Sequence, residues 1–294
     1  MYINKVIYMW IVFAFGSALF AGVTSILAKI GIKNTDSTAA TAIRTIVILF
    51  FSWLMVFITG AFGGIGGISA KALIFLMLSG LATGGSWLCY FKALQIGDVN
   101  KVTPVDKSST VLTMLLAFII LGEELSILKV ICMILIGAGT YLMIVKKETD
   151  KEVKGRGWLF YAVLSAVFAS LTSILGKIGI SGVDSSLGTA IRTIVVLIMA
   201  WVMVFVTKKQ DELKKIDGKS MVFICLSGLT TGLSWLCYYK ALQDGQASIV
   251  VPIDKLSILV TVAFSYIMLK ERLTKKSFAG LAMITAGTLM LVIK

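Results

Sequence analysis

The chain contains no histidine among its 294 residues, only two prolines and four cysteines, and charged residues make up 15% of it. Without histidine it lacks the commonest metal ligand and the commonest general base, so we expect no metal, no cofactor and no enzymatic chemistry. A soluble domain carries about a quarter charged residues. The low charge, the 58% of hydrophobic residues and the mean hydropathy of +0.95 therefore indicate a membrane protein.

Ten apolar stretches approach the length of roughly 20 residues that a helix needs to cross a bilayer. The first is too long for a cleaved signal peptide and lacks a cleavage site, so we expect it to be a span. All four cysteines lie inside these stretches, where they are expected to pack as small core residues rather than form disulfides. The expected spans are 6–29, 38–59, 72–95, 99–121, 127–145, 158–178, 187–207, 220–243, 247–269 and 276–293.

The chain contains one unit twice, at an offset of 148 residues. The stretches that begin at Thr24 and Pro104, for example, return at Thr172 and Pro252. Five spans in each unit predict two halves, 1–148 and 149–294, and an odd number of spans forces the second half to enter the membrane in the opposite direction. Inverted repeats are typical of secondary transporters. The predicted fold is an all-α membrane protein of ten transmembrane helices, arranged as two inverted-topology five-helix repeats.

Equivalent loops of the two halves differ in charge. The loop at 61–71 has Lys71 as its only cation, whereas its partner at 208–219 has five lysines. By the positive-inside rule, the basic loops of the second half and the central linker face the cytoplasm. Both termini then lie outside the cytoplasmic (inner) membrane of a bacterium or archaeon. Most of the net charge of +13 sits in loops, so we expect the lipid bilayer rather than nucleic acid as partner.

Charged residues inside the spans are the first candidates for a functional site, because a charge near the bilayer centre costs several kcal/mol. The half-one residues are expected to gather toward one membrane face and their half-two equivalents toward the other. An ion pair between Arg44 and Asp106 is the alternative, and lysines near span ends could instead extend to the interface. The main candidates are Arg44, Asp106, Lys107, Arg192, Asp254 and Lys255, and the secondary ones are Lys29, Lys92, Lys177 and Lys240.

Aromatic and hydroxyl side chains complete the candidate set. Trp87 and Tyr90 lie three residues apart and share a helix face, at a depth where Trp87 is unusual for an interfacial aromatic. Core packing is the alternative for the rings, and a bond to the carbonyl four residues earlier is the alternative for the hydroxyls. With their repeat partners the candidates are Trp87, Tyr90, Trp235, Tyr238, Thr24, Ser25, Ser86, Thr172, Ser173 and Ser234.

The fourth and ninth expected spans resemble a known family. They read Thr103-Pro104-Val105 to Gly122-Glu123-Glu124-Leu125, and Val251-Pro252 to Lys270-Glu271-Arg272-Leu273-Thr274. With the five-plus-five repeat, this is similar to the EamA-like family of the drug/metabolite transporter superfamily. The resemblance implies a central cavity lined by spans 1–4 and 6–9, with spans 5 and 10 at the periphery. Relatives of this kind are usually described with both termini in the cytoplasm, which differs from the orientation that the loop charges predict.

The leading functional hypothesis is a permease that moves a small polar metabolite by alternating access, as a monomer or homodimer. The excess of cations within the spans favours an anion or an amino-acid-like zwitterion. Small multidrug exporters of hydrophobic cations rely on an acidic residue in their first span, and the stretch 6–29 has none. An exporter of cationic or amphipathic drugs is the alternative, and a non-transporting accessory subunit is the alternative from another class.

Overall fold

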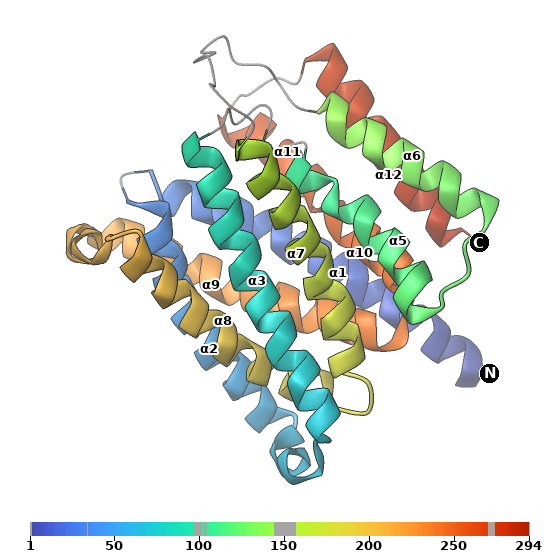
Figure 1. Ribbon diagram of the computed structural model, residues 1–294, viewed down its shortest axis with the longest axis horizontal. Coiled ribbons are helices and arrows are strands. Elements are labelled where there is room, and N and C mark those ends of the chain that lie inside the picture. Colours follow the sequence, from blue (N-terminus) through green and yellow to red (C-terminus); the bar gives the residue numbers. More distant parts are fainter. Residues whose placement is uncertain are drawn as a thin grey trace.

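The computed structural model describes residues 2–33, 35–96, 102, 105–143, 157–269 and 274–293, and every regular element in these ranges is helical (Figure 1). Two short 3-10 helices, η1 (Ala61–Gly67) and η2 (Gln210–Lys215), lie in loops. The linker cations between 146 and 156, Pro104 and the cations at 270–272 lie outside the described residues. The α-helices are α1 (Tyr2–Gly31), α2 (Ser37–Ile58), α3 (Ala70–Ile96), α5 (Ser109–Leu121), α6 (Ile127–Leu142), α7 (Gly157–Gly179), α8 (Ser185–Val206), α9 (Gly218–Asp244), α10 (Ala247–Lys255), α11 (Ser257–Leu269) and α12 (Lys275–Val292).

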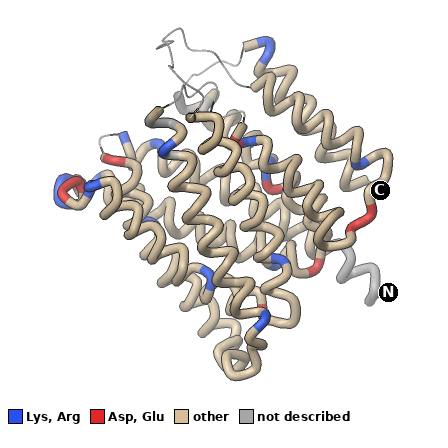
Figure 2. Tube along the Cα trace, viewed as in Figure 1, with Lys and Arg blue, Asp and Glu red and all other residues tan. Residues whose placement is uncertain are grey.

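Seven described helical segments are long and apolar enough to cross a membrane, and they match seven of the ten expected spans. The seventh, Ala247–Phe264, combines α10 with most of α11, which meet at Leu256 one turn after Pro252. The expected spans at 99–121, 127–145 and 276–293 correspond to α5, α6 and α12, of 13, 16 and 18 residues. Long stretches of the trace carry no charge, and charged residues gather mainly near the helix ends (Figure 2).

Equivalent aspartates begin the second helix of each half. The carboxylate of Asp36 accepts from the backbone N–H groups of Thr38 and Ala39, and Asp184 caps α8 in the same way. Asp36 also forms an ion pair with Lys209, with 3.2 Å between Nζ and Oδ2. Partial burial raises the pKa of Asp36, but the Ala39 N–H and Lys209 outweigh it and hold this pKa below its usual value. The ion pair places the start of α2 beside the end of α8.

The two halves pack through equivalent helix pairs. Helix α3 packs on α7, and the equivalent pair is α9 on α1; α2 packs on α8 and α6 on α12. Ser79 on α3 donates to the carbonyl of Thr172, whereas Ser86, two turns later, donates to the carbonyl of Ser165. Helices α3 and α7 therefore run in opposite directions. The α6–α12 pair lies to one side of the bundle (Figure 1).

Candidate functional site

Two adjoining pockets lie between the halves. The first has a volume of about 370 Å³ and is lined from α1, α2, α3, α7, α8, α9 and α10. The second, of about 340 Å³, extends toward the start of α2 and is lined by Thr41 and Lys107 among others. Arg44, Trp87 and Lys255 line both pockets. We refer to the two together as the cavity, and neither α6 nor α12 contributes a residue to it.

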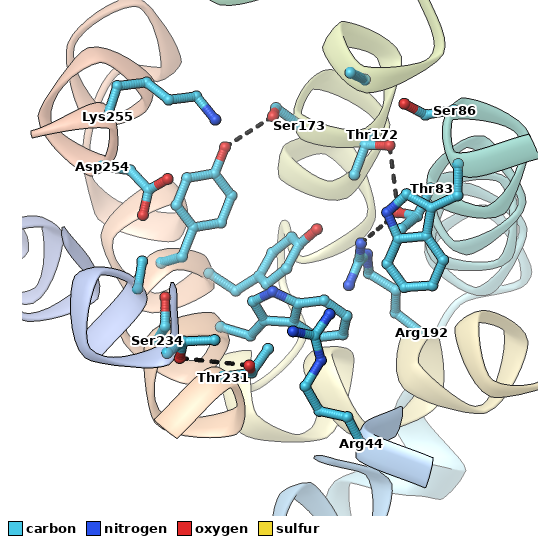
Figure 3. A pocket seen from close by; sticks show the side chains of 17 residues that line it. Arg44, Thr83, Ser86, Thr172, Ser173, Arg192, Thr231, Ser234, Asp254 and Lys255 are labelled. Carbon is cyan, nitrogen blue, oxygen red and sulfur yellow. Dashed lines mark hydrogen bonds between the residues drawn. The ribbon is translucent and has the colours of Figure 1, made fainter. Parts of the chain in front are cut away.

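Charged side chains of both halves meet in this cavity. Arg44 and Arg192 enter from α2 and α8, while Asp254 and Lys255 lie across from them on α10 (Figure 3). Asp106 and Lys107 of the first half line the adjoining pocket, which Lys255 also reaches. The grouping of half-one charges toward one membrane face and of half-two charges toward the other stays a prediction, but charges of both halves share one cavity. The reason is that helices of one half pack directly on those of the other, which brings equivalent charges toward a common centre.

Arg192 is held by many contacts. Its Nε donates to Ser79 Oγ at 3.1 Å and its Nη2 to Thr83 Oγ1 at 2.6 Å, both on α3. The guanidinium carbon lies 4.8 Å from the ring centres of Trp235 and Tyr239, a distance typical of cation–π contact. The residue is 2% exposed. Nη1 is buried without a hydrogen-bond partner in the described structure, so the arginine is desolvated but not fully satisfied.

Arg44 occupies the equivalent position in the first half and has a different environment. Its Nε is buried without a hydrogen-bond partner, and among the described residues it forms neither an ion pair nor a hydrogen bond. The ion pair between Arg44 and Asp106, considered as an alternative from the sequence, is thus not present. Within the same part of the chain, Lys107 and Lys255 also line the cavity without an ion pair or hydrogen bond.

Each carboxylate of the cavity binds a serine of the opposite half. Ser165 on α7 donates to Asp106 at 2.8 Å, and Ser17 on α1 donates to Asp254 at 2.6 Å. Ser17 also lies 3.2 Å from Ser234, as Ser165 lies 3.3 Å from Ser86. Sequence reasoning missed Ser17 and Ser165. The signal that could have found them was their recurrence at the 148-residue offset within otherwise apolar helices.

The remaining hydroxyl and aromatic candidates are divided between the cavity and other places. Tyr238 lines the cavity and bonds Ser173 at 2.8 Å, and Tyr90 lines the second pocket. Ser25, the repeat partner of Ser173, is instead exposed and donates to the carbonyl four residues earlier. Residues Thr24, Ser86, Thr172, Ser234 and Trp235 also line the cavity.

The four secondary lysines lie away from the cavity. Lys29 and Lys92 are exposed. Lys177 donates to the carbonyls of Leu242 and Gly245 at the end of α9, and Lys240 pairs with Asp244 at 3.1 Å. These lysines sit near helix ends, where free carbonyls, carboxylates and solvent are available partners.

The fold and the cavity together define a class: a helical membrane protein whose two repeats enclose a polar, cation-rich cavity large enough for a small molecule. A family model described as the EamA-like transporter family matches residues 8–145 and again 156–293. The chain belongs to this family. It is accordingly a membrane transporter rather than an enzyme.

Individual relatives agree with this assignment. A protein of Sinorhizobium sp named "Uncharacterized transporter in cobO 3'region" is 41% identical over 138 residues, which are 47% of this chain and 98% of that protein. The relative is thus about one repeat long. A protein of Archaeoglobus fulgidus named "Uncharacterized transporter" is 28% identical over 206 residues, 70% of either chain. One solved crystal structure is 14% identical with a TM-score of 0.80, over 99% of this chain and 97% of that one, which is a likeness of fold.

Proposed function

We propose that the chain is a secondary transporter of the cytoplasmic membrane that moves a small anionic or zwitterionic metabolite, such as an amino acid, by alternating access. The substrate occupies the cavity between the repeats and meets Arg44 first. The observation that carries this proposal is a set of cations in a cavity with walls from both halves. Within the described part of the chain these cations form no hydrogen bond and no ion pair; they are Arg44, Lys107 and Lys255.

The charge balance of the cavity supports an anionic group on the substrate. Four cationic and two acidic side chains line the two pockets. A guanidinium that lacks protein acceptors presents several donors to a carboxylate or phosphate, and desolvation strengthens such a bond. Asp106 and Asp254 each accept one serine hydroxyl and have acceptor capacity left, which suits the ammonium group of a zwitterion.

The packing of the halves supports inverted repeats. Helix α3 runs against α7, which is the counterpart of α1 in the second half. In an up-and-down half, α1 and α3 share one direction, so α7 would cross the membrane opposite to α1. Ten crossings, with α5, α6 and α12 spanning despite their length, complete this arrangement. Alternating access then follows from the two halves exchanging their conformations around the cavity.

A single chain supplies both halves of the cavity, which supports a monomer as the transporting unit, alone or within a homodimer. For the orientation, we retain the interpretation from the loop charges. The cytoplasmic side carries η2 and the linker, and both termini lie outside.

The test is a stabilisation screen followed by flux. Purified protein in detergent is heated with panels of amino acids, dicarboxylates, neutral sugars and the lipophilic cation tetraphenylphosphonium. A bound ligand at 100 times its Kd stabilises by about 2.7 kcal/mol, which is readily seen. We expect stabilisation by a carboxylate-bearing compound, lost in the Arg44→Met variant, and uptake of that compound into liposomes that contain only this protein. Stabilisation by the lipophilic cation alone would favour a drug exporter, and absence of any flux would favour an accessory subunit.

A further inference from the structure

Arg44 and Arg192 occupy equivalent positions in the two repeats but have different partners. Arg192 on α8 crosses to α3 and donates to Ser79 and Thr83. Ser79 in turn donates across the interface to the carbonyl of Thr172. Arg44 on α2 has no such bonds among the described residues, and its guanidinium lines both pockets.

The repeat offers Arg44 the same pair of hydroxyls, Ser227 and Thr231 on α9, and Arg44 bonds neither. Ser227 Oγ donates instead to the carbonyl of Ile224 in its own helix at 2.7 Å. Thr231 donates to the carbonyl of Ser227 at 2.7 Å, as Thr83 does to that of Ser79 at 3.0 Å, so the difference between the halves lies in the serines and the arginines. The two equivalent serines therefore differ. Ser227 bonds within its own helix and Arg44 is free, whereas Ser79 bonds across the interface and Arg192 is attached to it.

The backbones at the two sites are arranged alike. A Cβ built on Gly80 would lie 3.0 Å from the carbonyl oxygen of Arg192, and one built on Gly228 would lie 2.9 Å from that of Arg44. Glycine permits this close approach of α3 to α8 and of α9 to α2. Because both helix crossings are equally tight, a change of side-chain conformation would allow Arg44 to reach Ser227 and Thr231. The difference between the halves lies in the side chains.

The attached arginine lies toward the closed end of the molecule. Thr189, one turn into α8, is fully buried, whereas its equivalent Thr41, one turn into α2, is partly exposed and lines the second pocket. Lys107 at that open end is exposed. Around the two arginines, the start of α8 is thus closed, with Arg192 bonded to α3, and the start of α2 is more open, with Arg44 free.

We propose that the two arginines form a reciprocal latch. In the present structure, Arg192 donates to Ser79 and Thr83, and these bonds keep the cavity closed at the start of α8. In the opposite state, Arg44 binds Ser227 and Thr231 and closes the end at the start of α2, while Arg192 releases Ser79 and Thr83 and its guanidinium becomes free within the cavity. The proposal rests on the alternating access proposed above and assigns the Ser–Thr pairs of α3 and α9 as the residues that set which end is open. The free arginine of each state is the one available to the substrate.

The repeat provides matched variants for the test. One variant, Ser79→Ala with Thr83→Val, removes the latch hydroxyls of Arg192; the other, Ser227→Ala with Thr231→Val, removes those of Arg44. Each is combined with Thr41→Cys or with Thr189→Cys in a background free of native cysteines. The purified proteins, in detergent, react with a water-soluble methanethiosulfonate reagent, which reaches both ends at once. The readout is the ratio of the Thr189→Cys labelling rate to the Thr41→Cys rate, which requires neither a known substrate nor a known orientation.

We expect the α3 variant to raise this ratio by about tenfold or more, because hydrogen bonds to a charged donor are among the stronger ones that a variant can remove. The α9 variant should lower the ratio or leave it unchanged. Thr83→Ser, which keeps the hydroxyl, should retain the parent ratio, whereas Thr83→Val alone should raise it. If the double variant does not elute as a monodisperse protein, the comparison of Thr83→Val with Thr83→Ser replaces it as the test.

A rise of equal size in both double variants would overturn the proposal, since loosening of the bundle would then be the cause. So would an unchanged ratio in the α3 variant, or a Thr83→Ser protein that behaves like Thr83→Val. These outcomes are separable from the proposed function. If solute flux is observed but the labelling ratio does not change when the hydroxyls are removed, the transporter proposal stands and the latch proposal is rejected. If the labelling ratio changes when the hydroxyls are removed but no carboxylate is transported, the latch proposal stands and the proposed substrate class is rejected.

Discussion

Replacing the two arginines by methionine should separate stability from binding. Arg192 makes two hydrogen bonds and contacts two aromatic rings, while Arg44 has no bonded partner in the described structure. Hydrogen bonds to charged groups contribute roughly 1.5–3 kcal/mol each, and a desolvated cation–π contact about 2 kcal/mol. Burial of the guanidinium cancels part of this. We therefore expect Arg192→Met to lower the free energy of unfolding by about 2–4 kcal/mol and Arg44→Met by less than about 1 kcal/mol.

The assay is thermal unfolding in one detergent, followed by a dye that reacts with the native cysteines as the chain opens. About 1 kcal/mol corresponds to roughly 2–4 °C in a protein of this size, so Arg192→Met should lower the midpoint by roughly 5–15 °C. Arg44→Met should stay within about 3 °C of the parent but lose ligand-induced stabilisation. Equal losses of stability in the two variants would refute the reasoning, because the contacts of Arg192 would then contribute nothing that Arg44 lacks.

Four further outcomes are expected. Replacing Asp106 or Asp254 by Asn should slow transport far more than it lowers thermal stability; losses in proportion would make these residues structural. Flux into liposomes should not need a pH gradient, and uphill accumulation driven by that gradient but abolished in the Asn variants would contradict this. In intact cells without native cysteines, Ser69→Cys should react with an impermeant thiol reagent and Gln210→Cys should not; the reverse pattern would place both termini in the cytoplasm. Because the pKa of Asp36 is lowered on folding, the stability that its charge contributes is complete above about pH 4 and is lost as pH falls through the folded-state pKa. The variant Asp36→Asn keeps the N-cap, so its unfolding midpoint should lie below that of the parent at pH 7 and approach it near pH 3. An equal difference between the two midpoints at both pH values would exclude the charge as the cause.

The sequence predicts the all-helical membrane fold and the charged residues of the cavity for a clear physical reason. An ionised side chain in an apolar helix needs a partner, a wet cavity or an interface, so Arg44, Asp106 and Lys255 stand out in any span. The same rule does not separate the deep residues from those near helix ends. Lys177, a secondary candidate near a span end, binds carbonyls at the end of α9. The charge rule identifies candidates, and tertiary packing decides which of them share a cavity.

Other parts of the site could not be predicted because the local sequence is the same for several outcomes. A serine in an apolar helix has the same sequence context in two different cases. Its hydroxyl can donate to a carbonyl of its own helix, as in Ser227, or to one of a neighbouring helix, as in Ser79.

The unequal state of Arg44 and Arg192 is the feature that sequence reasoning is least able to reach. The two residues lie in nearly identical segments, so any rule based on sequence assigns them the same environment. Packing at Gly80 and Gly228 is also the same, which leaves the side-chain bonds as the variable. If each half can adopt both arrangements, then one structure provides two views of one latch: closed around Arg192 and open around Arg44. The same substitution made at equivalent positions of the two repeats therefore keeps the residue type and the helix position constant. Any difference between the two variants then reports the different side-chain bonds of Arg44 and Arg192.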